Sequence, residues 1–401
     1  MTDMAIPDHV PAELVRDWTL EEAGGALDPL AAMDARRVDG PPITFAPRGR
    51  RGGPSWMVNN YNMIIEVLQN PDLFSSDRYS GFSRLLGEDW AMIPIEIDPP
   101  LHRPFRQFMN KVFAPRVMNT LEDGIAETVR DIIATVRLRG ECEFQSTMGR
   151  PLPTSVFLRM LGLPLDDAGK LLEWESGLMH GANLEIRAQA ARNIKQYLLD
   201  AIADREASPR DDIISYVATA VVEDRPVTRI EKLGMCFVLY AAGLDTVAAT
   251  LGQMFKFLAE HPERQEELRN DPSIRAKAVE EIIRAHSSVT TGRILARDTE
   301  FHGVAMKKGD FISLPLLWAD RDPATFEDPA SIDFKRIDVM RHIAFGSGPH
   351  ACMGSHLARR ELRIVLDQWL ASMPPFRIAA NAAPRIYGGS VFGVDYLPLE
   401  W

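Results

Sequence analysis

The sequence has few cysteines and no long uninterrupted apolar segment. Its three cysteines, Cys142, Cys236 and Cys352, are odd in number and far apart along 401 residues. They therefore predict neither a disulfide framework nor a zinc site with paired ligands. No stretch of about 18 or more uncharged apolar residues occurs, and the first residues lack the apolar centre of a signal peptide. We expect a protein of the reducing cytoplasm that does not bind a membrane.

Basic residues are also scarce relative to acidic ones. The chain has 45 Lys and Arg against 56 Asp and Glu, a formal net charge of −11. A nucleic-acid-binding protein needs a basic face, so the composition argues against such a partner. The hydrophobic fraction of 46% is ordinary for a globular protein and sufficient for a large core. The length exceeds that of a single simple core, which predicts two domains or one large composite domain.

Helical periodicity dominates the sequence. Apolar residues recur at intervals of three and four in four segments, residues 121–137, 188–206, 229–262 and 273–287. The segment 229–262 is apolar on nearly all sides, and as one helix it would span roughly 50 Å through the middle of the molecule.

Strand patterns are shorter. They cover residues 55–60, 293–303, 310–316 and 393–401, and residues 307–310, "KKGD", are expected to turn a hairpin. The sequence therefore predicts a mainly α-helical protein with small β-sheets, and not a doubly wound α/β fold.

One cysteine lies in an unusual loop, "FGSGPHACMG" (345–354). A lone cysteine is most often a small buried hydrophobe. Here, glycines at 346, 348 and 354 leave the backbone bare, which suits both N–H donors directed at a sulfur and the close approach of a flat cofactor. The helix expected just after Cys352 directs its positive end at the sulfur and favours the thiolate. The loop fits an anionic sulfur beneath a planar ligand.

This loop resembles the cysteine-ligand loop of the cytochrome P450 haem-thiolate monooxygenases. "EEIIRAH" places Glu281 and Arg284 on one helix face, and the resemblance pairs them with Arg336 of "DFKRI" in a buried ion network. "AAGLDTV" (241–247) is similar to the family's oxygen-activation segment. Taken alone, Glu281 and Arg284 could be a solvated ion pair on a helix surface. Thr246 alone could simply donate a hydrogen bond to its own helix turn. It is the motifs together, in the family's order, that favour the resemblance.

The resemblance extends over essentially the whole chain and implies the cytochrome P450 fold. That fold is a triangular prism with a long central helix over the haem. We expect residues 1–401 to form a single domain with a helix-rich core and a smaller β-rich part near the N-terminus.

The resemblance also implies a haem b cofactor and a role for each motif residue. Cys352 would be the axial thiolate ligand of the iron. Thr246 would hold bound dioxygen and a water through hydrogen bonds, and Asp245 would relay protons from the surface. The small residues Ala242 and Gly243 would let the helix distort and make room for dioxygen. Two further residues are assigned to the haem site by the same resemblance, Phe345 and Gly346.

Haem propionates are anions that require fixed cations or donors. "DPPLHRPFR" (98–106) resembles the start of the family's propionate-binding helix, so His102 and Arg106 are candidates. Arg293 in "TGRIL" and His350 in the cysteine loop match two further propionate ligands. Each of these residues alone could also be an ordinary surface cation.

Within the family, the chain is most similar to the bacterial camphor-hydroxylating subfamily. The similar segments include "GLDTV", "GRILARDTEFHGVAMKKGD", "GSHLARRE" and "IPDHVPAELVRD". This likeness implies a monomer that receives electrons from a [2Fe–2S] ferredoxin and its NAD(P)H-dependent ferredoxin reductase. Arg106, Arg359 and Arg360 would form a local basic patch for an acidic ferredoxin.

The substrate pocket departs from that of camphor hydroxylase. Trp90 stands in "EDWAMIPIEID" where the relative has a tyrosine that binds the camphor ketone, and its indole N–H could still donate a hydrogen bond. The candidate pocket residues are nearly all apolar: Phe82, Trp90, Met92, Ile95, Val238, Leu239, Val289, Val391 and Phe392. Such a pocket favours a hydrophobic ligand with one polar group. We expect hydroxylation of an ionone-type norisoprenoid or a monoterpenoid ketone.

Three alternatives remain at this point. The chain could be a camphor hydroxylase proper, a peroxide-driven oxidase that needs no ferredoxin, or a haem-thiolate sensor without oxygen chemistry. A sensor has no need of an acid and an alcohol on the distal helix, and a peroxide-driven enzyme would be expected to replace them. The presence of Asp245 and Thr246 therefore favours the monooxygenase.

Overall fold

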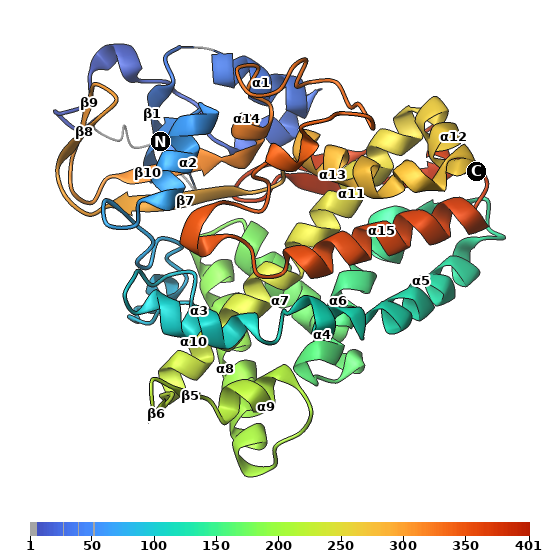
Figure 1. Ribbon diagram of the computed structural model, residues 1–401, viewed down its shortest axis with the longest axis horizontal. Helices are drawn as coiled ribbons and strands as arrows, with labels where there is room; N and C mark the ends of the chain where they lie inside the picture. Colours follow the sequence, from blue (N-terminus) through green and yellow to red (C-terminus); the bar gives the residue numbers. More distant parts are fainter. Residues whose placement is uncertain (1–5, 27, 39, 51–52) are drawn as a thin grey trace.

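Helices make up most of the protein, and small β-sheets gather beside them (Figure 1). The computed structural model describes residues 6–26, 28–38, 40–50 and 53–401. Its α-helices are α1 (Pro29–Val38), α2 (Tyr61–Gln69), α3 (His102–Asn110), α4 (Pro115–Asn119), α5 (Glu122–Val136), α6 (Pro151–Leu161), α7 (Ala168–His180), α8 (Leu184–Ala207), α9 (Ile213–Ala218), α10 (Arg229–Gly243), α11 (Asp245–Glu260), α12 (Pro262–Asn270), α13 (Arg275–Ala285), α14 (Leu316–Asp320) and α15 (Ser355–Ser372). This arrangement confirms the predicted mainly α-helical class.

The strands are short and come from widely separated parts of the chain. They are β1 (Ile43–Arg50), β2 (Gly53–Val58), β3 (Phe74–Ser75), β4 (Glu141–Glu143), β5 (Val221–Val222), β6 (Arg225–Pro226), β7 (Thr290–Leu295), β8 (Thr299–Phe301), β9 (Val304–Met306), β10 (Phe311–Pro315), β11 (Arg377–Ile378), β12 (Arg385–Tyr387), β13 (Gly393–Tyr396) and β14 (Pro398–Glu400). The largest sheet has the order β1-β2-β10-β7-β3. It joins the N-terminal strands to residues 290–315 on the side of the molecule away from α5 and α15 (Figure 1).

The expected hairpin at residues 307–310 is wrong in its position. The strands that pair across a tight turn are β8 and β9, and their turn residues, His302 and Gly303, have φ of 49° and 81°. Positive φ at both central residues is the geometry that matches the twist of paired strands. β10 instead pairs with β7 and β2. The segment expected as one strand over 293–303 is accordingly divided between β7 and β8.

The apolar segment expected as one helix over 229–262 is interrupted at Leu244, between α10 and α11. A Cβ on Gly243 would lie 2.8 Å from the Phe157 ring, so only glycine fits there. The expected distortion near Ala242 is therefore present. Residues 229–260 are long and apolar enough to cross a membrane, but 72% of their most apolar window is buried inside the protein. Such burial is typical of a core helix.

Aromatic packing fixes α11 against α15. The Phe255 ring lies 4.2 Å from that of Phe144 and 5.3 Å from that of Trp369, measured between centroids. All three side chains are fully buried, and burial of each stabilises the fold by about 1.5 to 3 kcal/mol. These contacts hold the C-terminal halves of α11 and α15 together.

A buried ion network organises the chain between α14 and α15. Arg284 donates from Nε and Nη2 to the two oxygens of Glu281, both at 2.8 Å, and Arg336 Nε donates to Glu281 Oε1 at 2.9 Å. Glu281 and Arg284 have no exposed side-chain surface. The contacts expected from "EEIIRAH" and "DFKRI" are therefore present, and they are buried rather than solvated.

Replacing Glu281 by glutamine is expected to lower the free energy of unfolding by about 3 to 5 kcal/mol, because two buried guanidinium groups lose their counter-charge. Urea unfolding measures the loss. The matched control is Glu260→Gln, which breaks a half-exposed pair with Lys256 and should cost less than about 1 kcal/mol. Similar losses in the two variants would show that the network does not organise the fold.

Candidate functional site

The cysteine loop is held in a conformation that only glycine allows at two positions. Gly346 and Gly348 have φ of 74° and 72°, and a Cβ on Gly348 would lie 2.7 Å from the carbonyl oxygen of Leu68. The Cys352 N–H donates to the carbonyl of Phe345 at 2.8 Å, which closes the loop. α15 begins three residues later, at Ser355.

The surroundings of Cys352 differ from those of the other two cysteines. Burial raises the pKa of its thiol, and the backbone N–H of Gly354 opposes that shift most strongly, ahead of Arg106, Arg359 and the N–H of Ser355. The residue still exposes surface. The chemistry of this donor set fits an anionic sulfur that binds a metal.

Cys142 and Cys236 lack such donors. Burial is the largest cause that raises the pKa of each of these thiols to about 12, and a carboxylate adds to it. Both therefore stay protonated, as structural cysteines do. Among the three cysteines, only Cys352 has an environment suited to a thiolate.

A cationic cluster lies next to this loop and consists of His102, Arg106, Arg293 and His350. The rings of His102 and His350 lie 4.4 Å apart between centroids, and Arg106 donates to the carbonyl of Ala351. Arg293 is buried with 3% of its surface exposed. The structure thus brings together the four residues that the sequence nominated as anion ligands.

The cationic cluster has more donors than its own side chains satisfy. His102 Nε2 and both ring nitrogens of His350 are buried without a hydrogen-bond partner among the described residues. Burial, with the charge of Arg106 second, lowers the pKa of His102 to about 4. Burial, followed by Arg293, lowers that of His350 to about 3. Buried, unpaired donors beside two guanidinium groups fit an anionic ligand such as a carboxylate.

Thr246 and Asp245 open α11 directly after the helix break. The Thr246 hydroxyl donates to the carbonyl of Ala242 at 3.0 Å. The hydrogen bond to its own helix turn, which was the alternative explanation for a threonine at this position, is therefore present. It also fixes the hydroxyl at the point where α10 ends. Ala242 is exposed and Thr246 half-buried, whereas Asp245 is buried with 8% exposed surface.

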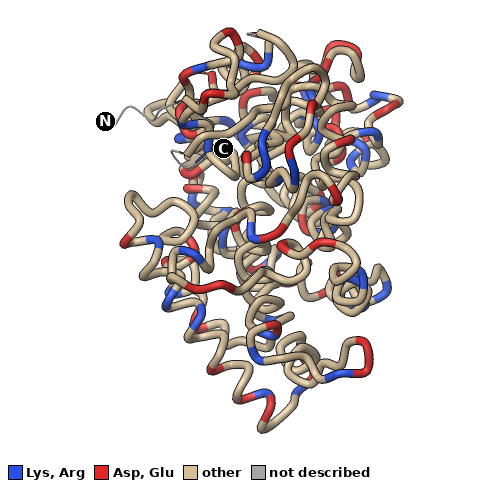
Figure 2. The backbone as a smooth tube through the Cα atoms, turned by 90° about the vertical axis from the view of Figure 1, so that its left-hand side faces the viewer, with Lys and Arg blue, Asp and Glu red and all other residues tan. Residues whose placement is uncertain are grey.

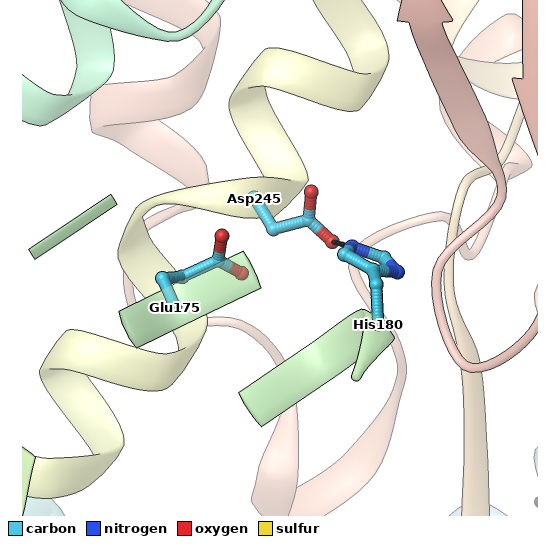
Figure 3. Close-up of side chains that lie close together, drawn as sticks. All are labelled: Glu175, His180 and Asp245. Carbon is cyan, nitrogen blue, oxygen red and sulfur yellow. Dashed lines mark ion pairs between the residues drawn. The ribbon is translucent and has the colours of Figure 1, made fainter. Parts of the chain in front are cut away.

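Three residues that sequence reasoning missed surround Asp245. The Tyr387 hydroxyl donates to Asp245 Oδ1 at 2.8 Å, and His180 Nε2 lies 3.5 Å from Oδ2. Glu175 approaches from the same helix as His180 (Figure 3). These residues come from α7 and β12 and carry no local motif, so nothing in the sequence connects them with Asp245.

The predicted pocket residues fall into more than one group. Six of them join the main apolar core, with Ile95 only partly buried: Phe82, Trp90, Met92, Ile95, Val238 and Leu239. Phe237, which the sequence did not single out, connects them, because its ring lies 5.0 Å from that of Trp90 and 6.1 Å from that of Phe82. The structure therefore brings the α10 residues and the loop before α3 together.

One expectation about the pocket is wrong. The Trp90 N–H donates to Glu88 at 2.7 Å, so it is already satisfied and is not the expected hydrogen-bond donor for a substrate. Phe392 packs with Trp18 and Trp318, and its N–H donates to the carbonyl of Ser288 at 2.7 Å, next to Val289. Val289 and Val391 form a β-bridge with each other, and Val289 packs against the apolar cluster of the largest sheet rather than the main core.

The expected basic patch carries less free charge than its sequence indicated. Arg359 pairs with Glu280 through two contacts, of 2.6 and 3.0 Å, and Arg360 pairs with Glu122 at 2.8 Å. Figure 2 shows acidic and basic residues intermingled along the visible side of the molecule. Arg106 alone of the three nominated arginines is paired with no carboxylate among the described residues.

Comparison with known proteins identifies the family. The cytochrome P450 family model matches residues 177–373. The probable cytochrome P450 127A1 of Sinorhizobium fredii is 41% identical over 99% of this chain and 97% of its own. The crystal structure of cytochrome P450 CYP101C1 is 32% identical with a TM-score of 0.88, covering 99% of this chain and 100% of the other. That of CYP101J2 is 30% identical with the same TM-score, covering 99% of both.

These likenesses confirm the expected fold along nearly the whole chain. Membership of this family also explains why the cysteine loop suits a metal-bound thiolate and why the cationic cluster suits an anionic ligand. The chain therefore belongs to the cytochrome P450 family, as a monooxygenase whose haem iron is bound by a cysteine thiolate.

Proposed function

We propose that Cys352 is the axial thiolate ligand and that the cationic cluster holds the haem propionates. The observation that carries this assignment is that Cys352, unlike Cys142 and Cys236, is approached by backbone N–H donors at a helix start. When bound, the haem supplies the iron at which dioxygen is activated, so that one oxygen atom enters a substrate C–H bond and the other leaves as water. The contacts of Phe345 and Gly346 within the loop support their place at the same site.

Thr246 and Asp245 provide the polar groups on the distal helix. The Thr246 hydroxyl, whose proton is donated to the Ala242 carbonyl, can still accept a hydrogen bond and so would orient a water molecule on the distal side. Asp245 begins the same helix turn and supplies protons to it. Apolar neighbours exclude other water, which limits the loss of reducing equivalents.

The substrate is a small hydrophobic terpenoid, with ionone-type norisoprenoids and monoterpenoid ketones as the preferred class. The aromatic group of Phe82, Trp90 and Phe237 offers edge and face contacts to such a ligand. Glu88 occupies the Trp90 N–H, so no ketone finds a free donor there, and apolar and aromatic contacts determine the fit. The unsaturated side chain of an ionone offers more of these contacts than the compact cage of camphor.

A [2Fe–2S] ferredoxin and its NAD(P)H-dependent reductase supply the electrons. The enzyme is a monomer and acts in the cytoplasm. A hollow of about 240 Å³ lies along α15, close to the cysteine loop, and is lined on one side by His356, Arg359, Arg360 and Arg363. Glu122 and Glu280 line it too. A carboxylate of the ferredoxin would replace Glu280 or Glu122 as the ion-pair partner of Arg359 or Arg360.

Titration of the ferric protein with β-ionone is expected to shift the Soret band fully from low-spin to high-spin, because a fitting ligand displaces the iron-bound water. Camphor should give little shift at the same concentrations. Absorption spectroscopy measures both. A full shift with camphor and none with β-ionone would overturn the substrate assignment.

Thr246→Ala is expected to lower the product formed per reducing equivalent by up to about tenfold, since a hydrogen bond between neutral groups contributes about 0.5 to 1.5 kcal/mol. Product and reductant are quantified together. Thr250→Ala is the matched control, one turn along α11, where the hydroxyl donates to the Thr246 carbonyl. A Thr246→Ala enzyme that stays fully coupled would rule out the role of the hydroxyl.

Arg293→Gln is expected to speed the loss of haem about tenfold, because a charge-assisted hydrogen bond to a propionate contributes about 1.5 to 3 kcal/mol. Transfer of haem to excess apomyoglobin gives the rate. Arg297→Gln serves as the control, since Arg297 is exposed and donates to the carbonyl of Asp72. Equal rates in both variants would remove Arg293 from the propionate site.

A further inference from the structure

We propose that His180 passes protons from solvent to Asp245 and is thus the outer member of the proton path of this enzyme. The inference rests on the proposed role of Asp245 and extends it to residues that no motif assigns. It depends on three features: the free oxygen of Asp245, the route from His180 to solvent, and the charge state of Glu175.

The first feature is the way in which the Asp245 carboxylate is held. Oδ1 accepts the Tyr387 hydroxyl at 2.8 Å, while Oδ2 is buried without a hydrogen-bond partner among the described residues. His180 Nε2 lies 3.5 Å from this Oδ2 (Figure 3). A shift of well under 1 Å brings that contact to a usual hydrogen-bond length of about 2.9 Å. The free oxygen of Asp245 therefore faces the imidazole.

The second feature is access to water. A hollow of about 650 Å³, lined by His180 and Tyr387 together with the N-terminal residues Thr19 and Glu21, opens to the surface. The His180 side chain has 34% of its surface exposed, against 9% for Asp245. Glu175 is buried. Within the cluster of Glu175, His180 and Asp245, protons can therefore enter at His180.

Tyr387 lines the same hollow but does not serve as an alternative entry. Burial raises its pKa well above that of a free phenol, and the Asp245 charge adds to the effect. Tyr387 therefore keeps its proton and acts as a fixed donor to Oδ1. An imidazole, by contrast, takes up and releases protons near neutral pH.

The third feature is that Glu175 adds little negative charge. Burial, and after it the charge of Asp245, raises the pKa of Glu175 to about 8. The group is therefore mostly protonated at pH 7, and the two carboxyl groups hold one proton between them. Arg150 faces the cluster from the start of α6, and its guanidinium pairs with Asp395 at 2.5 Å. Glu21 and Arg187 are the charged residues in the hollow.

Transfer is balanced in protons and needs no electrons. His180 gives its Nε2 proton to Asp245 Oδ2, and the imidazole takes up another from water in the hollow. Asp245 passes its proton toward Thr246, the next residue on α11.

The first test needs no substrate. Histidine NMR titration of the diamagnetic, carbon-monoxide-bound holoenzyme should show the His180 midpoint falling by about one pH unit in Asp245→Asn, because an opposite charge within about 4 to 6 Å is removed. The His302 signal is the internal control, since His302 lies in the exposed turn between β8 and β9 and pairs with Glu66 of α2. An unchanged His180 midpoint would overturn the pairing. So would a midpoint that moves on adding EDTA, because these three residues would then hold a metal ion.

The second test follows turnover with β-ionone in H₂O and D₂O. His180→Gln should slow the proton-dependent step about tenfold or more and raise its solvent isotope effect, while His302→Gln should change neither. His180→Lys separates relay from anchoring: lysine restores a positive charge beside Asp245 but holds its proton at neutral pH. Rescue by lysine would mean that His180 only positions Asp245. If the wild type forms no product, the proposed function fails, and the NMR titration still decides the pairing.

Discussion

The buried pairing of Glu281 with Arg284 and Arg336 is the constraint on which the placement of the haem ligand depends. The chain between α14 and the cysteine loop has little regular structure, so its backbone carbonyls need partners other than a helix or sheet ladder. The two guanidinium groups provide them: Arg284 donates to the carbonyls of Asp320, Pro329 and Ser331. A single carboxylate, by holding both arginines, shapes an otherwise irregular segment.

The same segment leads directly into the cysteine loop. Asp320, at the end of α14, accepts the N–H of Ile343 through Oδ1 at 2.6 Å, and the Ile343 carbonyl accepts the N–H of Gly346 at 2.7 Å. Cys352 then bonds back to Phe345. The sulfur is therefore connected to the ion network through a short series of backbone contacts. Distal groups are fixed independently, through the packing of α11.

Sequence reasoning succeeded where the chemistry is local. The loop glycines, the Glu–Arg spacing and the helix break just after Ala242 and Gly243 each depend on neighbours within a few positions. It failed where partners are distant: β10 pairs with β2, from the N-terminal part, and this long-range pairing overrides the hairpin signal at 307–310. The Trp90 donor was misjudged because its use depends on a rotamer that reaches Glu88. No sequence pattern reveals such a choice.

The distal side shows why long-range contacts matter most for function. A monooxygenase must deliver protons to a site from which it excludes water, so its relay acid has to be buried and yet connected to solvent. Asp245 is buried beside Glu175, and a second ionised carboxylate at that position would repel its charge. The Tyr387 donor stabilises the charge on one oxygen, and the protonation of Glu175 removes the second charge. The remaining oxygen stays available to a partner at the surface of the hollow, and His180 occupies that position.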